Sequence, residues 1–185
     1  MTGEHAVRRM RNKMLLSDSG RRIIRERPRI TGTTINLAQL GSYPTNTLGS
    51  HYHRFFSDHN ILPDTRAEVQ YIADDELAYV MQRYRECHDF MHVLSGLQIS
   101  VIAELGLKWF EFRQTGLPMT FLGATFGPLM LPLSELHLFY TKYLPWAELS
   151  GKQTEFFMNV IFEEFLAQDI QDVRRSLRLI PFPDN

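Results

Sequence analysis

The sequence has one cysteine, no long apolar run and almost no net charge, and each scarcity excludes a class of protein. Cys87 has no second cysteine among the 185 residues to pair with, which excludes a fold held by internal disulfides and suits a reducing compartment. No stretch approaches the roughly 20 consecutive apolar residues that cross a bilayer. With 44% hydrophobic and 22% charged residues, the composition is that of one globular domain.

The sequence also lacks alternating strand patterns, internal repeats and low-complexity tracts. Apolar residues recur at helical spacing instead, and Gly, Pro, Ser and Asp stand where helices would begin or end, as Pro63 does after the segment at 48–60. We therefore predict an all-α fold, a single-domain multi-helix bundle. The predicted helices lie within residues 8–16, 20–26, 33–44, 48–60, 74–95, 100–116, 133–146 and 153–179.

Charge is distributed unevenly, although the chain sums to −1. Residues 1–29 carry nine Lys or Arg against three acidic residues, and the remainder is acidic. Such a start is typical of a solvated basic helix, an anionic-lipid surface, a nucleic-acid arm or a mitochondrial transit peptide. Residues 25–40 read as folded-domain sequence, which disfavours the transit peptide, and the acidic body disfavours nucleic acid. We expect a basic N-terminal helical segment at 1–29, for which a membrane surface is one candidate partner, and an all-helical metal-binding body at 30–185.

The stretch CHDFMHVLSGLQISVIAE, residues 87–104, contains the pattern that favours metal binding. On a helix His88 and His92 lie about 40° apart and one turn apart, a spacing at which two imidazoles share an ion. Along a continuous helix Glu104 would lie about 18 Å beyond His92, too far to join them. Gly96 interrupts the helix, so we predict that the next helix folds back. His88, Asp89, His92 and Glu104 then form one metal site between two helices, whereas the alternative is a pair of buried core histidines.

Imidazoles and carboxylates suit zinc or iron(II), and the absence of thiolates argues against a soft site. Cys87 points about 100° away from His88 and is expected to be inert. Arg85 and Lys108 lie one turn from the motif and are candidates for holding an anionic substrate. Their alternative role is ion pairing with Glu86, Glu104 or Glu111.

With these motifs the chain resembles the ubiquinone (coenzyme Q) biosynthesis family that is described as the fourth member of that pathway. The resemblance rests on His-Asp-x-x-His followed by eleven residues and Glu, within DDELAYVMQRYRECHDFMH and ahead of KWFEFRQTGLPMTFLGATFGP. RERPRI, NILPDTRAEV and YLPWA agree as well, so the resemblance covers roughly residues 20–178. A competing phosphohydrolase of the HD type would use upstream histidines such as His51, His53 or His59, but the eleven-residue spacing to Glu104 disfavours it.

The resemblance implies an all-helical protein that binds zinc at His88, Asp89, His92 and Glu104. It implies a peripheral position on the matrix face of the mitochondrial inner membrane, although this chain shows no leader, and contact with other ubiquinone biosynthesis proteins. The implied reaction removes the C1 carboxylate of 4-hydroxy-3-methoxy-5-polyprenylbenzoate, either simply or with hydroxylation at C1. The alternative implied role is a non-catalytic, polyprenyl-lipid-binding scaffold of a multi-enzyme complex. We also expect a homo-oligomer.

Three expectations remain about individual segments. Asp89 is a ligand by resemblance, but by comparison with HExxH sites it is also a candidate proton donor. The apolar segment 118–133 is interpreted first as a buried core connector and second as a lipid tunnel or interfacial segment. The stripe formed by Phe156, Phe157, Val160, Ile161 and Phe165 is expected to be core or a contact between protomers.

Overall fold

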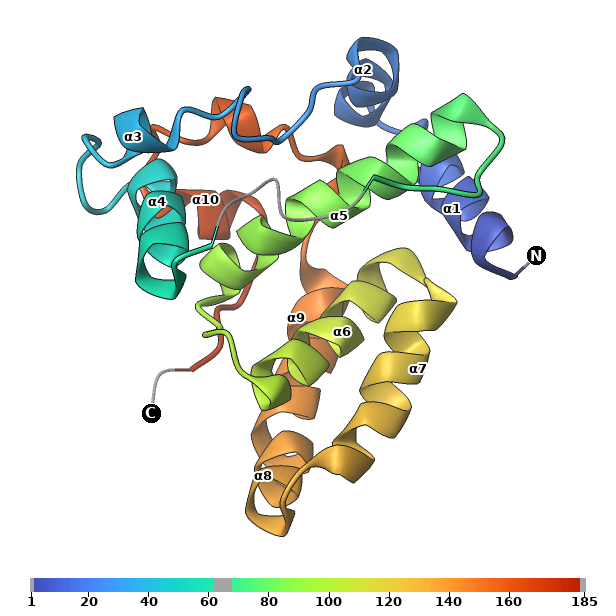
Figure 1. Cartoon of the computed structure of the whole chain (residues 1–185), viewed down its shortest axis with the longest axis vertical. Coiled ribbons are helices and arrows are strands. Elements are labelled where there is room, and N and C mark those ends of the chain that lie inside the picture. The colour runs from blue at the N-terminus through green and yellow to red at the C-terminus, as the bar shows by residue number, and fades with distance from the viewer. Residues whose placement is uncertain (1, 62–67, 184–185) are drawn as a thin grey trace.

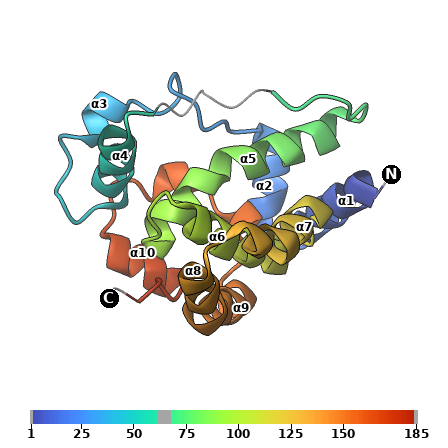
Figure 2. The same ribbon diagram turned by 60° about the horizontal axis from the view of Figure 1, so that its bottom comes forward.

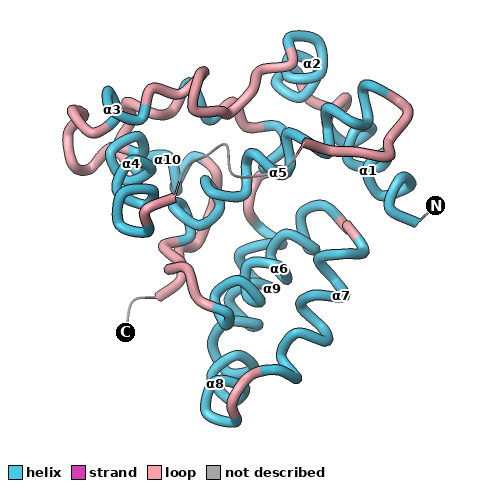
Figure 3. Tube along the Cα trace, in the orientation of Figure 1, coloured by secondary structure: helices cyan, strands magenta, loops and turns pink. Residues whose placement is uncertain are grey.

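The computed structural model describes residues 2–61 and 68–183. Over these residues the chain forms helices and loops without a β-strand, which confirms the all-α prediction (Figure 3). The helices are α1 (Thr2–Met14), α2 (Asp18–Glu26), α3 (Leu37–Leu40), α4 (Leu48–His59), α5 (Asp75–Ser95), α6 (Val101–Thr115), α7 (Pro118–Phe126), α8 (Leu133–Leu138), α9 (Leu144–Gln153) and α10 (Ile170–Ser176). Single turns of other helix types are η2 (Gly127–Met130), η3 (Phe139–Tyr143), η4 (Phe157–Asn159) and η5 (Phe162–Glu164).

Helix α5 is the longest element, with 21 residues, and crosses the middle of the molecule (Figure 1). It begins where Asp74 accepts hydrogen bonds from the backbone N–H groups of Glu76 and Leu77, each at 3.0 Å. It ends at Gly96, whose φ of 77° lies in the left-handed region that glycine enters without steric cost. The predicted boundaries of this helix are therefore confirmed by local capping chemistry.

The remaining helices surround α5 in three groups (Figures 1 and 2). Helices α1 and α2 lie near its first half, α3, α4 and α10 lie near its second half, and α6 to α9 extend to one end of the molecule. Ala6, Val7, Met10, Met14 and Ile23 are at most 2% exposed and belong to the main core. The basic N-terminal segment is thus packed into the same core as the rest of the domain.

The predicted long helix at 153–179 is wrong. Gln153 is the last residue of α9, residues 154–169 form single turns and loops, and α10 is the α-helix that follows. The reason is tertiary, because backbone groups here find partners far away in the sequence. The Gln114 amide donates to the carbonyls of Gly151 at 2.7 Å and Thr154 at 3.1 Å and accepts from the N–H of Phe157 at 3.0 Å. The expected aromatic stripe is nevertheless core, since Phe156, Phe157 and Val160 are buried.

The predicted helix at 133–146 is longer in the structure and runs from α8 through η3 into α9. Pro145 stands in the first turn of α9, directly after the π-helical turn η3. A π turn widens the helix locally, which relieves the clash between the proline ring and the carbonyl of the preceding turn. This arrangement lets the helix continue past a residue that normally ends one.

The first interpretation of residues 118–133, a buried core connector, is wrong. The segment forms α7 and η2, and its large apolar side chains face outward. Leu129, Met130 and Leu133 are 77%, 86% and 84% exposed. Across the described part of the chain, no helix combines the length and apolar character that crossing a bilayer requires.

Candidate metal centre

Helices α5 and α6 bring three of the predicted ligands together. His88 and His92 lie one turn apart on α5, with ring centroids 4.9 Å apart and ring planes at 80°. Glu104 lies in the first turn of α6, and its Oε1 is 2.8 Å from the Nε2 atom of His92. Its Oε2 atom is 3.7 Å from the Nε2 atom of His88. One donor atom from each residue lies within 4.8 Å of the other two, as the helix-pair prediction requires.

The other nitrogen of each imidazole is engaged by the protein. The Nδ1 atom of His92 lies 3.2 Å from the carbonyl of Leu97, in the loop that joins the two helices. The Nδ1 atom of His88 lies 2.6 Å from Oε1 of Glu111. Each Nδ1 is held by an acceptor, so both Nε2 atoms face the carboxylate of Glu104 and can donate to it, and an ion bound there would replace the Nε2 protons. The protein thereby orients both rings before any ion binds.

Glu111 is the site residue that sequence reasoning missed in this role. Its side chain is fully buried, and its second oxygen accepts a hydrogen bond from Nζ of Lys108 at 2.7 Å. Glu111 follows Glu104 by seven residues, two helical turns, so both carboxylates project from the same face of α6. This seven-residue spacing is the sequence signal from which the position of Glu111 at the site could have been predicted. The later histidine of α5, His92, faces the earlier glutamate of α6, Glu104. The earlier histidine, His88, faces the later glutamate, Glu111, as expected for two antiparallel helices.

The electrostatics of this cluster favour the charged state of its carboxylates. Burial is the largest influence on the pKa of Glu111 and raises it, but His88 and Lys108 together lower the pKa to about 2. Burial likewise raises the pKa of Glu104, and hydrogen bonds from His88 and His92 lower it well below its usual range. For His88, burial lowers the pKa, while Glu111 and Glu104 outweigh it and leave the pKa raised. Two anionic carboxylates therefore flank the imidazoles.

The remaining predicted site residues occupy different positions. Asp89 is buried but does not join the three-residue cluster. Lys108 makes the ion pair with Glu111 that was its alternative role. Arg85 lines a groove of about 520 Å³ whose walls include Leu117 and Met119. Cys87 is fully buried, and burial raises the pKa of its thiol to about 12, which agrees with an inert residue.

The donor set fits a zinc or iron(II) ion. Ligands about 2.1 Å from a tetrahedral ion lie about 3.4 Å from one another, and the Nε2-to-carboxylate distances of 2.8 and 3.7 Å bracket that value. The two histidine side chains are 6% and 1% exposed, whereas that of Glu104 is 35% exposed. The cluster is thus closed on the core side and accessible from the Glu104 side. Three protein donors with one accessible side are typical of catalytic rather than structural zinc.

The upstream histidines of the competing phosphohydrolase pattern do not complete this cluster among the described residues. They lie on α4, where Nδ1 of His59 is 2.7 Å from the carbonyl of Phe55 and Nε2 of His53 is 3.4 Å from Oγ of Ser57. Residues 62–67 of the NILPDTRAEV motif, with Pro63, lie outside the described part of the chain.

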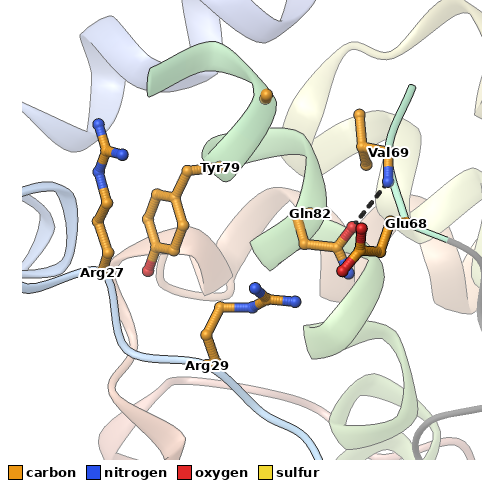
Figure 4. A pocket seen from close by; sticks show the side chains of 7 residues that line it. Arg27, Arg29, Glu68, Val69, Tyr79 and Gln82 are labelled. Atoms are coloured by element: carbon orange, nitrogen blue, oxygen red, sulfur yellow. Dashed lines mark hydrogen bonds between the residues drawn. The ribbon is translucent and has the colours of Figure 1, made fainter. Parts of the chain in front are cut away.

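A second hollow, of about 340 Å³, lies beside the first half of α5 (Figure 4). Arg27, Arg29, Glu68 and Gln82 face it, and the side chain of Gln82 accepts a hydrogen bond from the N–H of Val69 at 3.0 Å. None of the predicted site residues lines this hollow. It is therefore separate from the chemistry expected of the chain.

Comparison with known proteins agrees with the motif. The family model described as "Coenzyme Q (ubiquinone) biosynthesis protein Coq4" matches residues 1–183. The mitochondrial ubiquinone biosynthesis protein coq4 of Schizosaccharomyces japonicus is 44% identical over 96% of this chain and 74% of its own length. The corresponding protein of Phaeosphaeria nodorum is 47% identical over 97% of this chain and 62% of its own. The mitochondrial COQ4 homolog of Rattus norvegicus is 40% identical over 98% of this chain and 69% of its own.

The chain spans less than two thirds of the length of several of these curated relatives, down to 56%. Among solved structures, the crystal structure of a Nostoc punctiforme protein assigned to ubiquinone biosynthesis is similar, with a TM-score of 0.75. The match covers 93% of this chain and 80% of that one at 21% sequence identity. This likeness supports the fold alone.

Proposed function

The chain belongs to the Coq4 family of coenzyme Q biosynthesis proteins, and we propose that it is a metal-dependent decarboxylase of that pathway. The proposed substrate is a 4-hydroxy-3-methoxy-5-polyprenylbenzoate, which loses its C1 carboxylate. The observation that supports catalysis is the arrangement of His88, His92 and Glu104. Their donor atoms lie within 4.8 Å of one another, and the side chain of Glu104 is 35% exposed, so a substrate can reach the cluster from that side.

The chain's own residues would divide the work as follows. When CO2 leaves C1, the electron pair of the broken bond stays on the ring. In simple decarboxylation that pair bonds to a proton, and in the oxidative alternative it bonds to an oxygen atom from O2, which is the two-electron oxidant. A bound zinc or iron(II) ion would supply Lewis acidity and a template for the substrate oxygens. Arg85, which lines the apolar groove, is our candidate for pairing with an anionic group of the substrate. Asp89 is our candidate for the proton donor or a further ligand.

Lys108 would act through Glu111 rather than on the substrate. Its ammonium group already pairs with the buried carboxylate, which in turn holds Nδ1 of His88. The buried carboxylate needs a compensating cation, because an isolated charge in the interior is costly. We therefore assign Lys108 to positioning.

The proposed location is the matrix side of the mitochondrial inner membrane, at its surface and in contact with other ubiquinone biosynthesis proteins. The names of the curated relatives support the mitochondrion. A polyprenyl substrate supports the membrane surface, since a long apolar chain resides in the bilayer. The homo-oligomer stays a prediction.

The metal site is tested by metal analysis of the purified protein. Glu104→Gln should lower the bound metal per chain strongly, because the carboxylate is the only anionic donor of the three-residue cluster in the described structure. Glu135→Gln, a carboxylate on α8, serves as the control and should retain metal. Equal metal content in wild type and Glu104→Gln would refute the site between α5 and α6.

The reaction is tested by single-turnover incubation with a short-chain 4-hydroxy-3-methoxy-5-prenylbenzoate, with and without oxygen, followed by mass spectrometry of CO2 and ring products. Release of CO2 that disappears in His88→Ala supports the metal enzyme, and oxygen at C1 of the product makes the reaction oxidative. No turnover with zinc or iron(II), in the presence of partner proteins, would favour the scaffold instead.

A further inference from the structure

Helix α7 buries its small residues and exposes its large ones. Thr120 and Ala124 are 0% and 3% exposed and face the protein, whereas Met119, Leu122 and Phe126 are 55%, 51% and 58% exposed. The exposed residues recur at intervals of three and four, so they form one stripe along the helix. A surface helix of a globular protein normally shows the opposite pattern, with its large apolar residues facing the core.

The stripe continues around the corner between α7 and α8. Leu129, Met130 and Leu133 are the most exposed large apolar residues of this region, and residues 116–134 contain no charged side chain. We call these six residues, Met119, Leu122, Phe126, Leu129, Met130 and Leu133, the α7–α8 surface. An apolar surface of this kind on a protein in water marks a place where something else binds.

A cationic helix adjoins this surface. Helix α1 carries four Lys or Arg against one Glu, and a guanidinium nitrogen of Arg9 lies 3.5 Å from the carbonyl of Gly116, just before α7 begins. Arg8 is also exposed, although it pairs with Glu4 at 2.9 Å. Arg8 and Arg9 therefore place positive charge beside the start of the apolar stripe.

The side chains and the position of the α7–α8 surface indicate which kind of partner binds to it. Its side chains are Met, Phe and Leu, which offer no hydrogen-bonding group of the kind that protein interfaces use about once per 100–200 Å². The corner between α7 and α8 also lies at one end of the long axis of the molecule, away from α2 (Figures 1 and 2). The apolar stripe runs from the cations beside the start of α7 to this protruding end, and a surface of this kind is complementary to lipid tails below anionic headgroups.

We propose that the α7–α8 surface inserts into the interface of an anionic bilayer while Arg8 and Arg9 contact its headgroups. This inference specifies the surface for the membrane location proposed above and does not depend on the decarboxylation. The groove lined by Arg85 supports it, because Met119 and Leu122 belong both to the groove and to the α7–α8 surface. Insertion would therefore bring the bilayer to the mouth of a groove that reaches the helix of the metal ligands.

Vesicle flotation tests the proposal with the full chain and no substrate. Wild type should float with phosphatidylcholine vesicles that contain phosphatidylglycerol and less with phosphatidylcholine alone. The triple variant Leu129→Gln, Met130→Gln, Leu133→Gln should lose partitioning about tenfold or more, because it removes the apolar residues that insert. Arg8→Glu with Arg9→Glu should remove the preference for the anionic lipid.

The control replaces two exposed apolar residues elsewhere, Leu16→Gln with Leu149→Gln, which are 84% and 56% exposed in the wild type. This control should float like wild type, and all variants should keep the metal content and melting temperature of wild type. Equal losses in the control and the triple variant would overturn the proposal. The absence of wild-type binding to vesicles would also overturn it. If sedimentation then shows a dimer that the triple variant abolishes, the α7–α8 surface binds a second copy of the chain instead of a bilayer.

Because metal content and turnover are measured on the same variants, a failure here is distinguishable from a failure of the proposed function.

Discussion

The hydrogen bond between Glu111 and His88 leads to a sharp prediction about metal affinity. Glu111→Gln keeps the shape of a fully buried side chain but removes the charge that faces Nδ1 of His88 at 2.6 Å. A neutral amide is a weaker acceptor for the imidazole N–H and leaves the ring less basic at Nε2. We therefore expect the variant to fold and to bind its metal more weakly.

The magnitude follows from the position of the residue. Loss of a carboxylate that orients a metal-binding histidine typically costs 10–100-fold in metal affinity, about 1.4–2.8 kcal/mol. The loss should be smaller than that of Glu104→Gln, since Glu104 supplies a donor atom itself. Lys108 also loses its anionic partner, but its side chain is 27% exposed, so water can solvate the ammonium group.

The assay is competition for zinc or iron(II) against a chromophoric chelator, with the melting temperature of the metal-free protein measured in parallel. Glu26→Gln is the matched control, because Glu26 also pairs with cations, Arg22 and Arg25, but lies on the surface. It should bind metal like wild type. Wild-type affinity in Glu111→Gln would refute the positioning role, and a lowered melting temperature with unchanged affinity would make Glu111 merely structural.

Two further predictions concern packing and reactivity. Gly20→Ala should destabilise the protein by about 1–3 kcal/mol in urea unfolding, because a Cβ atom there would lie well inside the contact distance of the Met14 carbonyl. Gly3→Ala, also helical but with no atom within 4 Å of the new Cβ, should be neutral or stabilising, and equal effects at the two glycines would contradict this reasoning. Cys87 should not react with a thiol reagent at pH 8 in the native protein, since it is fully buried with a pKa of about 12, and should react once unfolded. Rapid native labelling would show that α5 opens more readily than its burial suggests.

The helices of the metal centre were predictable because their ends are set by nearby residues. Asp74 and Ser100 accept hydrogen bonds from the first turns of α5 and α6, and Gly96 and Gly116 adopt positive φ at their ends. These interactions span only a few residues, so the local sequence contains all the information they need. The convergence of His88, His92 and Glu104 followed, because a break between two helices forces the chain to turn.

The region after α9 was not predictable in the same way. Its apolar spacing is helical, but the N–H groups of Leu48 and Gly49 bond to the carbonyls of Gln168 and Leu166 at 2.9 and 2.8 Å. These partners are more than one hundred residues away in the sequence, so local periodicity does not contain them. Tertiary contacts replaced the helical hydrogen bonds there while the aromatic residues kept their place in the core.

The sequence by itself determined the helical class, the paired helices and the three side chains of the candidate metal centre, because periodicity, caps and ligand spacing are local properties. Only the tertiary structure decided that Glu111 meets His88, since that contact depends on how closely α5 and α6 approach. It also decided that the apolar segment at 118–133 faces outward. An apolar side chain is equally apolar in a core and on a surface, and only the position of its neighbours determines whether water or another molecule contacts it.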